Sequence, residues 1–499
     1  MKKVNKILCM ALGATFLATG CATVGNITNK ENEIIYNGNA GVVVDGNLYF
    51  GNSVADYSAS GFSYKDAKTY AYLARLNQKI DLDSKSGDYS PKGVENVASE
   101  VVGQSHSFMF ALGNYLYYAT PNQKEFSDSN GKPAKHFEYT TLFRCKLNGD
   151  KNKEVYTTEG EVSKIEVLKY GDDYYVVMLA GSKLVRINVG NAKKAKADVS
   201  VLAEDVTSVA IPKTFEQEKT GSSLDWNGYV YFTVAKTDED NSDVGGTIIK
   251  RIKLDSKEAE ELEGRSKNES FAFVGREKDV VFYTCKKNGT VAYTYASDLT
   301  GDNSKMAILN KEKEVYTSAL SDFAEIVETR GSKTETAVVG YMCLNSSTVM
   351  VAKKNSNGFD VNSVSFTADG SAVSSYKILA KDERVLYLGT TTGIYRADLS
   401  YALNGASSVV CQTVTKMTSI YDKAIASYDG EYVYFYAKLE EVKEEDKDTS
   451  SSEEETEKET DDNYYLYRTK VNKTYLDENK NYELLSLTKI KSRRTENQK

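Results

Sequence analysis

The chain has little of several residues on which common active sites depend. Its 499 residues include four prolines, one tryptophan and two histidines. Neither His106 nor His136 stands in a zinc-binding or HExxH spacing, and no G-x-S-x-G nucleophile elbow is present. The single Trp226 excludes the tryptophan-bearing repeats of sialidases and quinoprotein dehydrogenases. We therefore expect no catalytic residue, no metal and no cofactor. The one kind of active site that the sequence leaves open is a pair of catalytic carboxylates, as in glycosidases. The two residues of such a pair are neighbours only in space and leave no motif in the sequence.

The six cysteines lack any CxxC spacing. Cys9 and Cys21 lie near the N-terminus, and the other four, Cys145, Cys285, Cys343 and Cys411, stand far apart in apolar, strand-like runs. An exported protein can pair such residues. A chain of this length buries a core without disulfides, so we expect free thiols that pack as small apolar groups.

No apolar run is long enough to cross a bilayer, and the N-terminus has a different pattern. The basic MKKVNK precedes the apolar ILCMALGATFLATG, and Cys21 follows at once. This order resembles a bacterial lipoprotein signal, whose cleavage motif here is Ala18-Thr19-Gly20-Cys21, with Ala18 where leucine is commoner. The resemblance implies cleavage after Gly20, lipid attachment at Cys21, and a membrane-anchored protein on the extracytoplasmic side. The alternative is an ordinary secretory signal.

The charge of the chain is concentrated in one segment. Residues 440–462 hold 13 acidic and 3 basic side chains, so the remainder is close to neutral. Nucleic acid requires a basic surface, which excludes it as a partner. The segment is expected to be an extended, solvated loop.

Tyrosine is abundant, with 36 residues, and much of it belongs to a repeat. Two alternating apolar runs are joined by a turn such as Asp45-Gly46 or Asp429-Gly430, which is a strong hairpin signal. Eight copies start at Val42, Phe110, Leu168, Asp225, Gly275, Cys343, Ala380 and Ser427. We take residues such as Val349 and Leu386 as equivalent positions of successive copies, which gives an average repeat of about 55 residues. This is longer than a WD40 blade, so we expect the additional residues to lie in loops.

A third and a fourth run complete most copies. The third run carries a repeated arginine, at Arg75, Arg144, Arg186, Arg251, Arg396 and Arg468. Four strands per unit, repeated, predict an all-β fold, a β-propeller of four-stranded antiparallel blades. Eight blades are expected, with seven as the alternative. The short step from Val349 to Leu386 predicts that the sixth unit lacks a full outer strand. Two tandem β-sandwiches are the competing fold.

The repeated tyrosines have two interpretations. Tyr117, Tyr175, Tyr231, Tyr387 and Tyr434 either bury their rings between blades or form a platform for sugars or peptides, and their recurrence favours burial. The repeated arginines either form an anion ring in a central channel or cover the sheet while pairing with an acidic turn residue. The second arrangement is the one we expect.

The predicted domains are a signal peptide (1–20), a lipidated tether (21–32), a propeller (33–490) with its acidic loop (440–462), and a basic tail (491–499). The unit DG-x-L-Y-F … L-x-R resembles Tyr-rich propeller repeats of envelope proteins and lipoproteins of anaerobic Gram-positive bacteria. That resemblance implies a monomeric, non-catalytic binding or scaffold protein with a protein or peptide partner. The alternatives are a glycan- or cell-wall-binding lipoprotein and a hydrolase with a carboxylate pair in the channel.

Overall fold

The computed structural model describes most of the chain between residues 34 and 486. The predicted signal peptide, tether, acidic loop and basic tail lie outside the described residues. The described ranges are 34–55, 62–77, 94–102, 108–122, 124–127, 130–135, 137, 139–212, 228–235, 247–261, 269–277, 280–287, 291–298, 312–316, 322–330, 335–345, 348–355, 358–417, 419–421, 426–439, 463–471 and 482–486.

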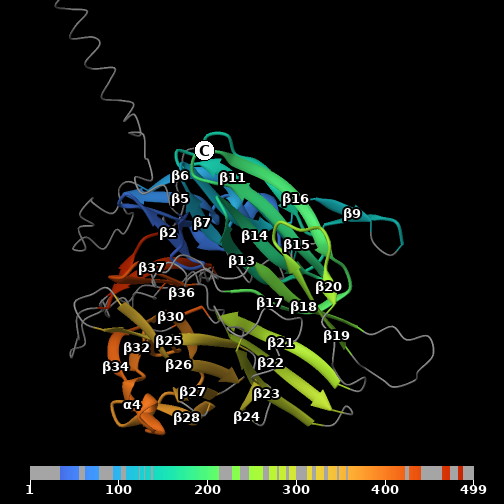
Figure 1. The fold of residues 1–499 in the computed structure, drawn as a ribbon. Coiled ribbons are helices and arrows are strands. Elements are labelled where there is room, and N and C mark those ends of the chain that lie inside the picture. The colour runs from blue at the N-terminus through green and yellow to red at the C-terminus, as the bar shows by residue number, and fades with distance from the viewer. Residues whose placement is uncertain are drawn as a thin grey trace, which may run out of the picture.

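Antiparallel strands account for nearly all of the described structure (Figure 1). They form eight sheets of at least four strands, which we number in chain order. Sheet 1 contains β2 (Gly41–Val44), β3 (Asn47–Gly51), β5 (Tyr72–Asn77) and β6 (Val94–Val101). Sheet 2 contains β7 (Met109–Leu112), β8 (Tyr115–Pro121), β11 (Thr140–Lys146) and β12 (Lys153–Thr157). Sheet 3 contains β13 (Val162–Tyr170), β14 (Asp173–Ala180), β15 (Lys183–Gly190) and β16 (Ala195–Ala203). Sheet 4 contains β17 (Val206–Ala210), β18 (Tyr229–Ala235), β19 (Thr247–Lys253) and β20 (Glu260–Glu261).

The second half of the chain repeats this order. Sheet 5 contains β21 (Glu269–Glu277), β22 (Val280–Lys287), β23 (Val291–Asp298) and β24 (Glu312–Tyr316). Sheet 6 contains β25 (Asp322–Arg330), β26 (Glu335–Asn345), β27 (Thr348–Asn355), β28 (Gly358–Ala368) and β29 (Ser371–Ala372). Sheet 7 contains β30 (Lys377–Asp382), β31 (Val385–Gly389), β32 (Gly393–Asp398) and β34 (Gln412–Lys416). Sheet 8 contains β35 (Ala426–Tyr428), β36 (Tyr432–Lys438), β37 (Tyr464–Lys470) and β38 (Glu483–Leu484).

Short elements decorate the sheets. The helix α2 (Tyr64–Ala67) begins at Ser63, whose Oγ accepts a hydrogen bond from the Asp66 N–H at 3.3 Å. The helix α4 (Ser400–Leu403) precedes β33 (Ser408–Val410), which joins sheet 6 in parallel to β28. The strands β9 (Glu125–Ser127) and β10 (Pro133–Lys135) form a separate hairpin. No helix among these residues is long and apolar enough to cross a membrane.

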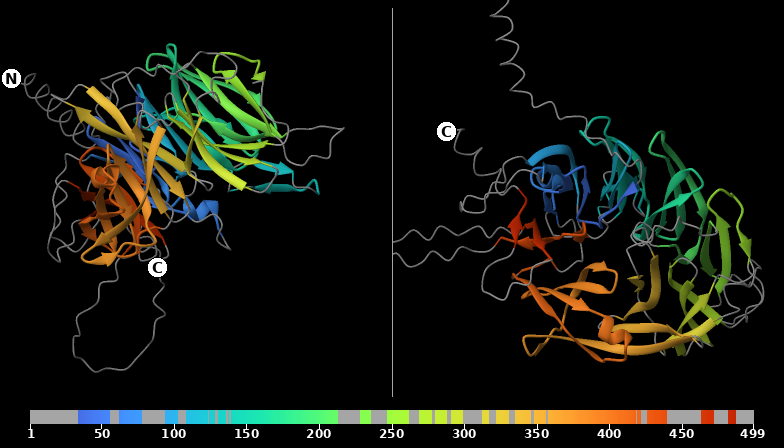
Figure 2. Two further views of the ribbon diagram at one scale, coloured as in Figure 1. Left: turned by 60° about the horizontal axis from the view of Figure 1, so that its bottom comes forward. Right: turned by 60° about the vertical axis from the view of Figure 1, so that its left-hand side comes forward.

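The sheets follow one another around a ring (Figure 2, right). Phe110 and Tyr117 of sheet 2 share one core cluster with Val176 and Met178 of sheet 3. Comparable clusters join sheets 1 and 2, 3 and 4, 6 and 7, 7 and 8, and 8 and 1. Sheets 1, 2, 3, 7 and 8 are thus covered on both faces, which is why their strands are apolar on consecutive residues. Radial four-stranded antiparallel sheets are an architecture of β-propeller type.

The start of the chain closes the ring. The strand β4 (Ser53–Val54) pairs with β37, and the Ser53 Oγ donates to the Tyr464 carbonyl at 2.6 Å. Gly38 forms a β-bridge with Ser427, whose Oγ also accepts from the backbone N–H of Gly41 at 2.9 Å. These bonds join residues almost 400 positions apart. They couple the stability of the first sheet to that of the last.

The two ends of the ring differ in their connections. We call one end of the ring the turn face. It carries the turns between first and second strands, for example Asp45–Gly46, Gly113–Asn114 and Gly171–Asp172. The opposite end, where second strands connect to third strands, is called the loop face. It carries α2 and the β9–β10 hairpin. Asp45 and Gly46 both have positive φ, 48° and 72°, as the predicted Asp-Gly hairpin turn requires.

The sixth unit corrects one sequence prediction. The hairpin of the sixth copy, at Asn345–Thr348, joins β26 to β27, which are the second and third strands of sheet 6, and not the first and second. The first strand, β25, lies upstream of it. The outer strand that was expected to be incomplete is β28, with 11 residues. Two apolar alternating hairpins follow each other here, and period-two patterning does not tell which of them is the inner one.

Candidate binding face

The repeated tyrosines and arginines lie side by side on adjacent strands. In five sheets the second-strand tyrosine is the direct cross-strand partner of the third-strand arginine. These pairs are Tyr49–Arg75, Tyr117–Arg144, Tyr231–Arg251, Tyr387–Arg396 and Tyr434–Arg468. In sheet 3 the position opposite Arg186 is Val177, so the half-buried Tyr175 is two residues out of phase with the repeat.

The arginine heads do not form an anion ring. They stand on third strands, away from the inner strands. Arg251 pairs with Glu260 at 2.9 Å and Arg468 with Glu483 at 2.6 Å, and Arg75 pairs with Glu95. In these three sheets an acidic partner is present, but it lies on the outer strand and not, as predicted, in a turn. Among the described residues Arg144 and Arg186 have no such partner and donate to backbone carbonyls of the next sheet, at Lys196 and Leu254.

Four of the five repeated tyrosines bury their rings, which is the interpretation that their recurrence at equivalent positions favoured. Tyr117, Tyr231, Tyr387 and Tyr434 are at most 3% exposed. The hydroxyl of Tyr117 donates to the Val189 carbonyl of sheet 3 at 3.3 Å, and that of Tyr49 to the Leu147 carbonyl of sheet 2 at 2.7 Å. Both acceptors stand three residues after the repeated arginine. An aliphatic residue at that spacing, R-x-x-[LV], is a sequence signal for this contact that the repeat analysis missed.

Two of the four internal cysteines can be placed. Cys145 and Cys411 are buried and unbonded to each other or to another cysteine. Burial raises the pKa of Cys145 to about 12 and that of Cys411 to about 11, so both thiols stay protonated and unreactive. This confirms the predicted free thiols at these two positions. The side chains of Cys285 and Cys343 lie outside the described part of the chain.

The predicted lipid-attachment residues lie outside the described residues. This holds for Ala18, Thr19, Gly20 and Cys21, and also for His106, His136 and Trp226. Among the residues that are described, no group of three or more histidine, cysteine or carboxylate side chains gathers at a spacing that would hold a metal ion.

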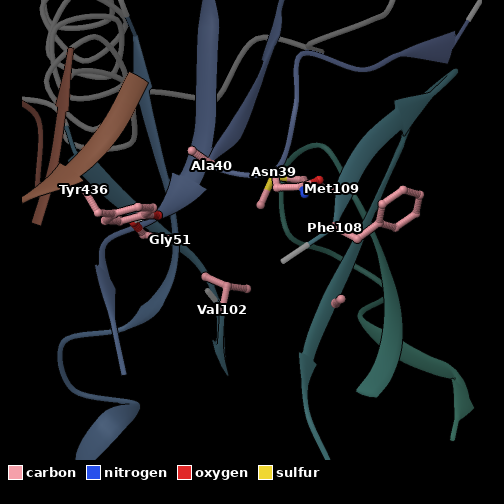
Figure 3. Close-up of a pocket in the computed structure, with 8 residues that line it drawn as sticks. Asn39, Ala40, Gly51, Val102, Phe108, Met109 and Tyr436 are labelled. Atoms are coloured by element: carbon pink, nitrogen blue, oxygen red, sulfur yellow. Dashed lines mark hydrogen bonds between the residues drawn. The ribbon is translucent and has the colours of Figure 1, made fainter. Parts of the chain in front are cut away.

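A small hollow of about 10 Å³, partly open to solvent, lies on the loop face where sheets 1, 2 and 8 meet (Figure 3). Its described lining is Asn39, Ala40, Gly51, Val102, Phe108, Met109, Ala119 and Tyr436. These residues end or begin strands: Gly51 is the last residue of β3, and Met109 is the first of β7. The sequence did not single out the hollow, because its residues come from distant segments that only ring closure brings together.

The polar side chains in the lining of the hollow have partners. The hydroxyl of Tyr436 donates to the Gly51 carbonyl at 2.8 Å, and burial raises the pKa of this tyrosine well above its ordinary value. The Asn39 Oδ1 accepts from the Tyr36 hydroxyl at 2.8 Å. None of the eight described lining residues is a carboxylate, a histidine or a thiol. This lining offers contact surface and an amide, but no acid, base or nucleophile.

An aromatic wall stands beside the hollow. It consists of Phe62, Tyr64 and Phe137, which come from the β3–β5 and β8–β11 connections. The rings of Phe62 and Phe137 lie 4.8 Å apart edge-on, and those of Tyr64 and Phe137 lie 6.1 Å apart. The Tyr64 hydroxyl accepts from the Val101 N–H at 3.3 Å, next to Val102 of the hollow. All three rings are only partly buried.

Comparison with known proteins identifies no family. No family model matches the chain, and no curated protein matches it either. Solved structures resemble it at low identity. A prolyl endopeptidase matches with a TM-score of 0.38 at 10% identity, over 84% of this chain and 55% of that chain. Dipeptidyl peptidase 4 from Porphyromonas gingivalis matches with 0.37 at 9%, over 81% and 57%. TolB from Acinetobacter baumannii matches with 0.28 at 10%, over 60% and 66%.

These structures contain β-propeller-type folds, like the one the ring geometry defines. The chain spans little more than half the length of the two peptidases, and at TM-scores below 0.5 none of the likenesses carries an argument about activity.

Proposed function

We propose that the chain is an extracytoplasmic lipoprotein, anchored through acylated Cys21, whose eight-bladed propeller binds a protein or peptide partner at the cell envelope without catalysing a reaction. The proposed contact surface is the loop face, with the hollow and the aromatic wall. Residues 33–490 form the propeller in this proposal, and the eight sheets of the described residues support that blade count.

The single observation that carries the binding role is the partly exposed aromatic wall of Phe62, Tyr64 and Phe137. Aromatic rings that stay accessible on a surface are typical anchors of protein contacts. The hollow has a volume of about 10 Å³, room for about one water molecule, so it encloses neither a metabolite nor a side chain.

The burial of the tyrosines weighs against the glycan alternative. A sugar platform requires exposed aromatic faces, whereas the rings of Tyr49, Tyr117, Tyr434 and Tyr436 are at most 1% exposed. Three of the repeated arginines, Arg75, Arg251 and Arg468, are already paired with glutamates and are not free to attract anionic wall polymers. The wall residues Phe62 and Phe137 stay partly exposed.

The test compares two substitutions to phenylalanine in the tagged, acylated chain. Asn39→Phe places a large ring on the loop face, at the edge of the hollow, and Asp172→Phe adds the same side chain to an exposed turn on the opposite face. Each protein is recovered from the envelope of its own cells. We expect a stoichiometric partner with the parent and with D172F, and its loss with N39F. Retention on purified cell wall by all three proteins, with no protein partner, would favour the glycan alternative. Turnover of wall oligosaccharides by the parent would favour the hydrolase.

A further inference from the structure

The outer edge of sheet 3 is a long strand with an open side. β16 has nine residues and pairs with β15, and no other strand of the described residues adjoins it (Figure 1). The outer strands β12, β20, β24, β34 and β38 have two to five residues, and the longer β28 is covered by β33. Half of the backbone N–H and C=O groups of an edge strand point away from its sheet. They form a template on which another strand can pair.

Two valines make this edge apolar. Val199 and Val201 are 38% and 47% exposed, and they are two of the four large apolar side chains that are exposed in the described part of the chain. They lie opposite Ile187 and Val185 of β15, whose side chains are buried against sheet 2. Cross-strand partners share a face, so the valines continue this apolar face to the outer edge of the sheet. By contrast, the eight-residue edge strand β6 exposes polar side chains.

The charges at the two ends of β16 are opposite in sign. Lys193 and Lys194 stand in the connection before the strand, and Glu204 and Asp205 stand in the connection after it. All four residues are exposed. An antiparallel second copy of β16 brings the basic end of each copy to the acidic end of the other, whereas a parallel copy would bring like charges together.

One register satisfies the valines and the charges together. It places the two Val199 residues opposite each other on a two-fold axis. Lys194 of each copy then comes beside Glu204 of the other, because both positions are five residues from Val199. Asp198 faces Ser200, so no like charges meet along the strand. β16 therefore supplies, in its own sequence, the strand that complements its edge.

We infer that two copies of the chain pair through β16 into an antiparallel dimer, in which the four strands of each sheet 3 join into one continuous sheet across a two-fold axis. This interface lies on the outer rim of the ring and is separate from the proposed contact surface on the loop face. It depends neither on the proposed lipid anchor nor on the loop-face partner. It replaces the monomer that the resemblance to Tyr-rich propeller repeats implied.

The pairing is tested with a cysteine placed on the two-fold axis. Val199→Cys is produced in the full chain, and intact cells are treated with a short bismaleimide crosslinker. Opposite Cβ atoms on antiparallel strands are about 5 Å apart, so we expect a product of two chains, linked from position 199 to position 199 by mass spectrometry. Val410→Cys is the matched control, because Val410 is 78% exposed on the outer strand β33. It is expected to give at most about a tenth of that product.

Val201→Cys tests the register. The two copies of position 201 lie four residues apart along the paired strands, which is about 13 Å, so we expect at least about fivefold less product than from V199C. Equal yields from positions 199 and 201 would overturn the register. A V199C yield no greater than that of V410C would overturn the dimer. A V199C adduct with a different protein, in place of a second copy, would assign the edge to a foreign strand and would also overturn it.

The charge pairing is tested in the V199C chain with Lys194→Glu and, separately, Glu204→Lys. Each substitution places like charges at both ends of the paired strands, and we expect at least about threefold less product from either variant. Co-production of the two variants pairs one reversed charge with the other. It is expected to restore the parent yield as a product with one copy of each variant. Urea unfolding shows that each variant is folded. An unchanged yield in either variant alone, or no recovery on co-production, would overturn the antiparallel pairing of these ends.

Discussion

The turn face and the loop face differ in how they connect the first three strands of each sheet. On the turn face seven of the eight connections between first and second strands hold two to four residues, and a side chain can bond to the backbone of the turn. Asp429 is an example: its Oδ1 accepts from the N–H groups of Glu431 and Tyr432 at 2.9 and 2.8 Å, and its Oδ2 from the Tyr434 hydroxyl at 2.6 Å. On the loop face the connections from second to third strands vary more, and those after β3 and β8 hold about twenty residues each.

The difference separates stability from recognition. Short turns fix the register of the first two strands in seven sheets, so a change there alters the free energy of unfolding. Long connections on a rigid frame are free to vary in length and side chains, which is where binding residues are usually found. The predictions below divide along this line, from the largest expected effect to the smallest.

The largest effect is expected at the ring closure, which holds both faces together. In Gly38→Val the new Cβ would lie 2.5 Å from the Ala426 carbonyl oxygen, at a φ of 116° that valine does not adopt. We expect a loss of at least about 3 kcal/mol in urea unfolding. Gly430→Val is the matched control, because its φ of 98° is equally strained but no atom lies within 4 Å. Equal losses in the two variants would show that the closure contact contributes nothing.

The next largest loss of stability is expected at Arg468, a buried arginine in the middle of sheet 8. Arg468→Met removes the partner of Glu483 and the cation over the Tyr432 ring, 4.4 Å from its centroid. We expect a loss of about 2 kcal/mol, measured by denaturant unfolding. Glu483→Gln is expected to cost less, because that side chain is 37% exposed and the glutamine still accepts a hydrogen bond. Binding to the loop face is expected to be unchanged in both.

A smaller effect is expected within the turn face. Asp429→Ala removes three hydrogen bonds, two of them to backbone groups, and we expect a loss of about 1–2 kcal/mol. Asp429→Asn keeps an acceptor for the backbone N–H groups and is expected to retain most of the stability. The urea unfolding midpoints of the parent, D429A and D429N measure this difference in stability. If D429A weakened partner binding without lowering stability, the separation of the two faces would be wrong.

The smallest expected effect is a pH-dependent loss of stability at Asp173, which lies at the turn face. Burial raises the pKa of Asp173, but hydrogen bonds from Lys196 and Asn188 outweigh it and hold the pKa below its ordinary value. The group therefore contributes stability that is present above pH 4 and is lost as pH falls through the lower pKa of the folded state. Comparing unfolding of the parent and Asp173→Asn between pH 7 and pH 3, we expect the difference to shrink as pH falls. A constant difference would contradict this.

Much of the ring follows from local sequence. The hairpin turns at Asp45–Gly46 and Asp429–Gly430 and the burial of most of the repeated tyrosines were predicted, because period-two patterning and turn chemistry act over a few residues. Sheet 6 was misassigned because two of its hairpins have equivalent patterns. The strand Ser408–Val410 pairs with β28 of the neighbouring sheet, a contact that no local pattern encodes.

The hollow was beyond such prediction for the same reason. Asn39, Val102 and Tyr436 have nothing in common in sequence, and they meet only because residues 34–54 return to sheet 8. The aromatic wall joins two insertions that follow no repeat. The residues Ser63 to Asn77 can be read from the sequence as a helix or as a loop and a third strand, and the structure has one helical turn, α2, followed by the strand β5.

The most direct test of the account is a site-specific photo-crosslink in living cells. Benzoylphenylalanine replaces Phe62 on the loop face or Asp172 on the turn face of the acylated chain. The account predicts a discrete protein adduct from position 62, none from position 172, and a weaker adduct when Asn39→Phe places a ring on the same face. Adducts of equal yield from both positions, or no adduct from position 62, would contradict it.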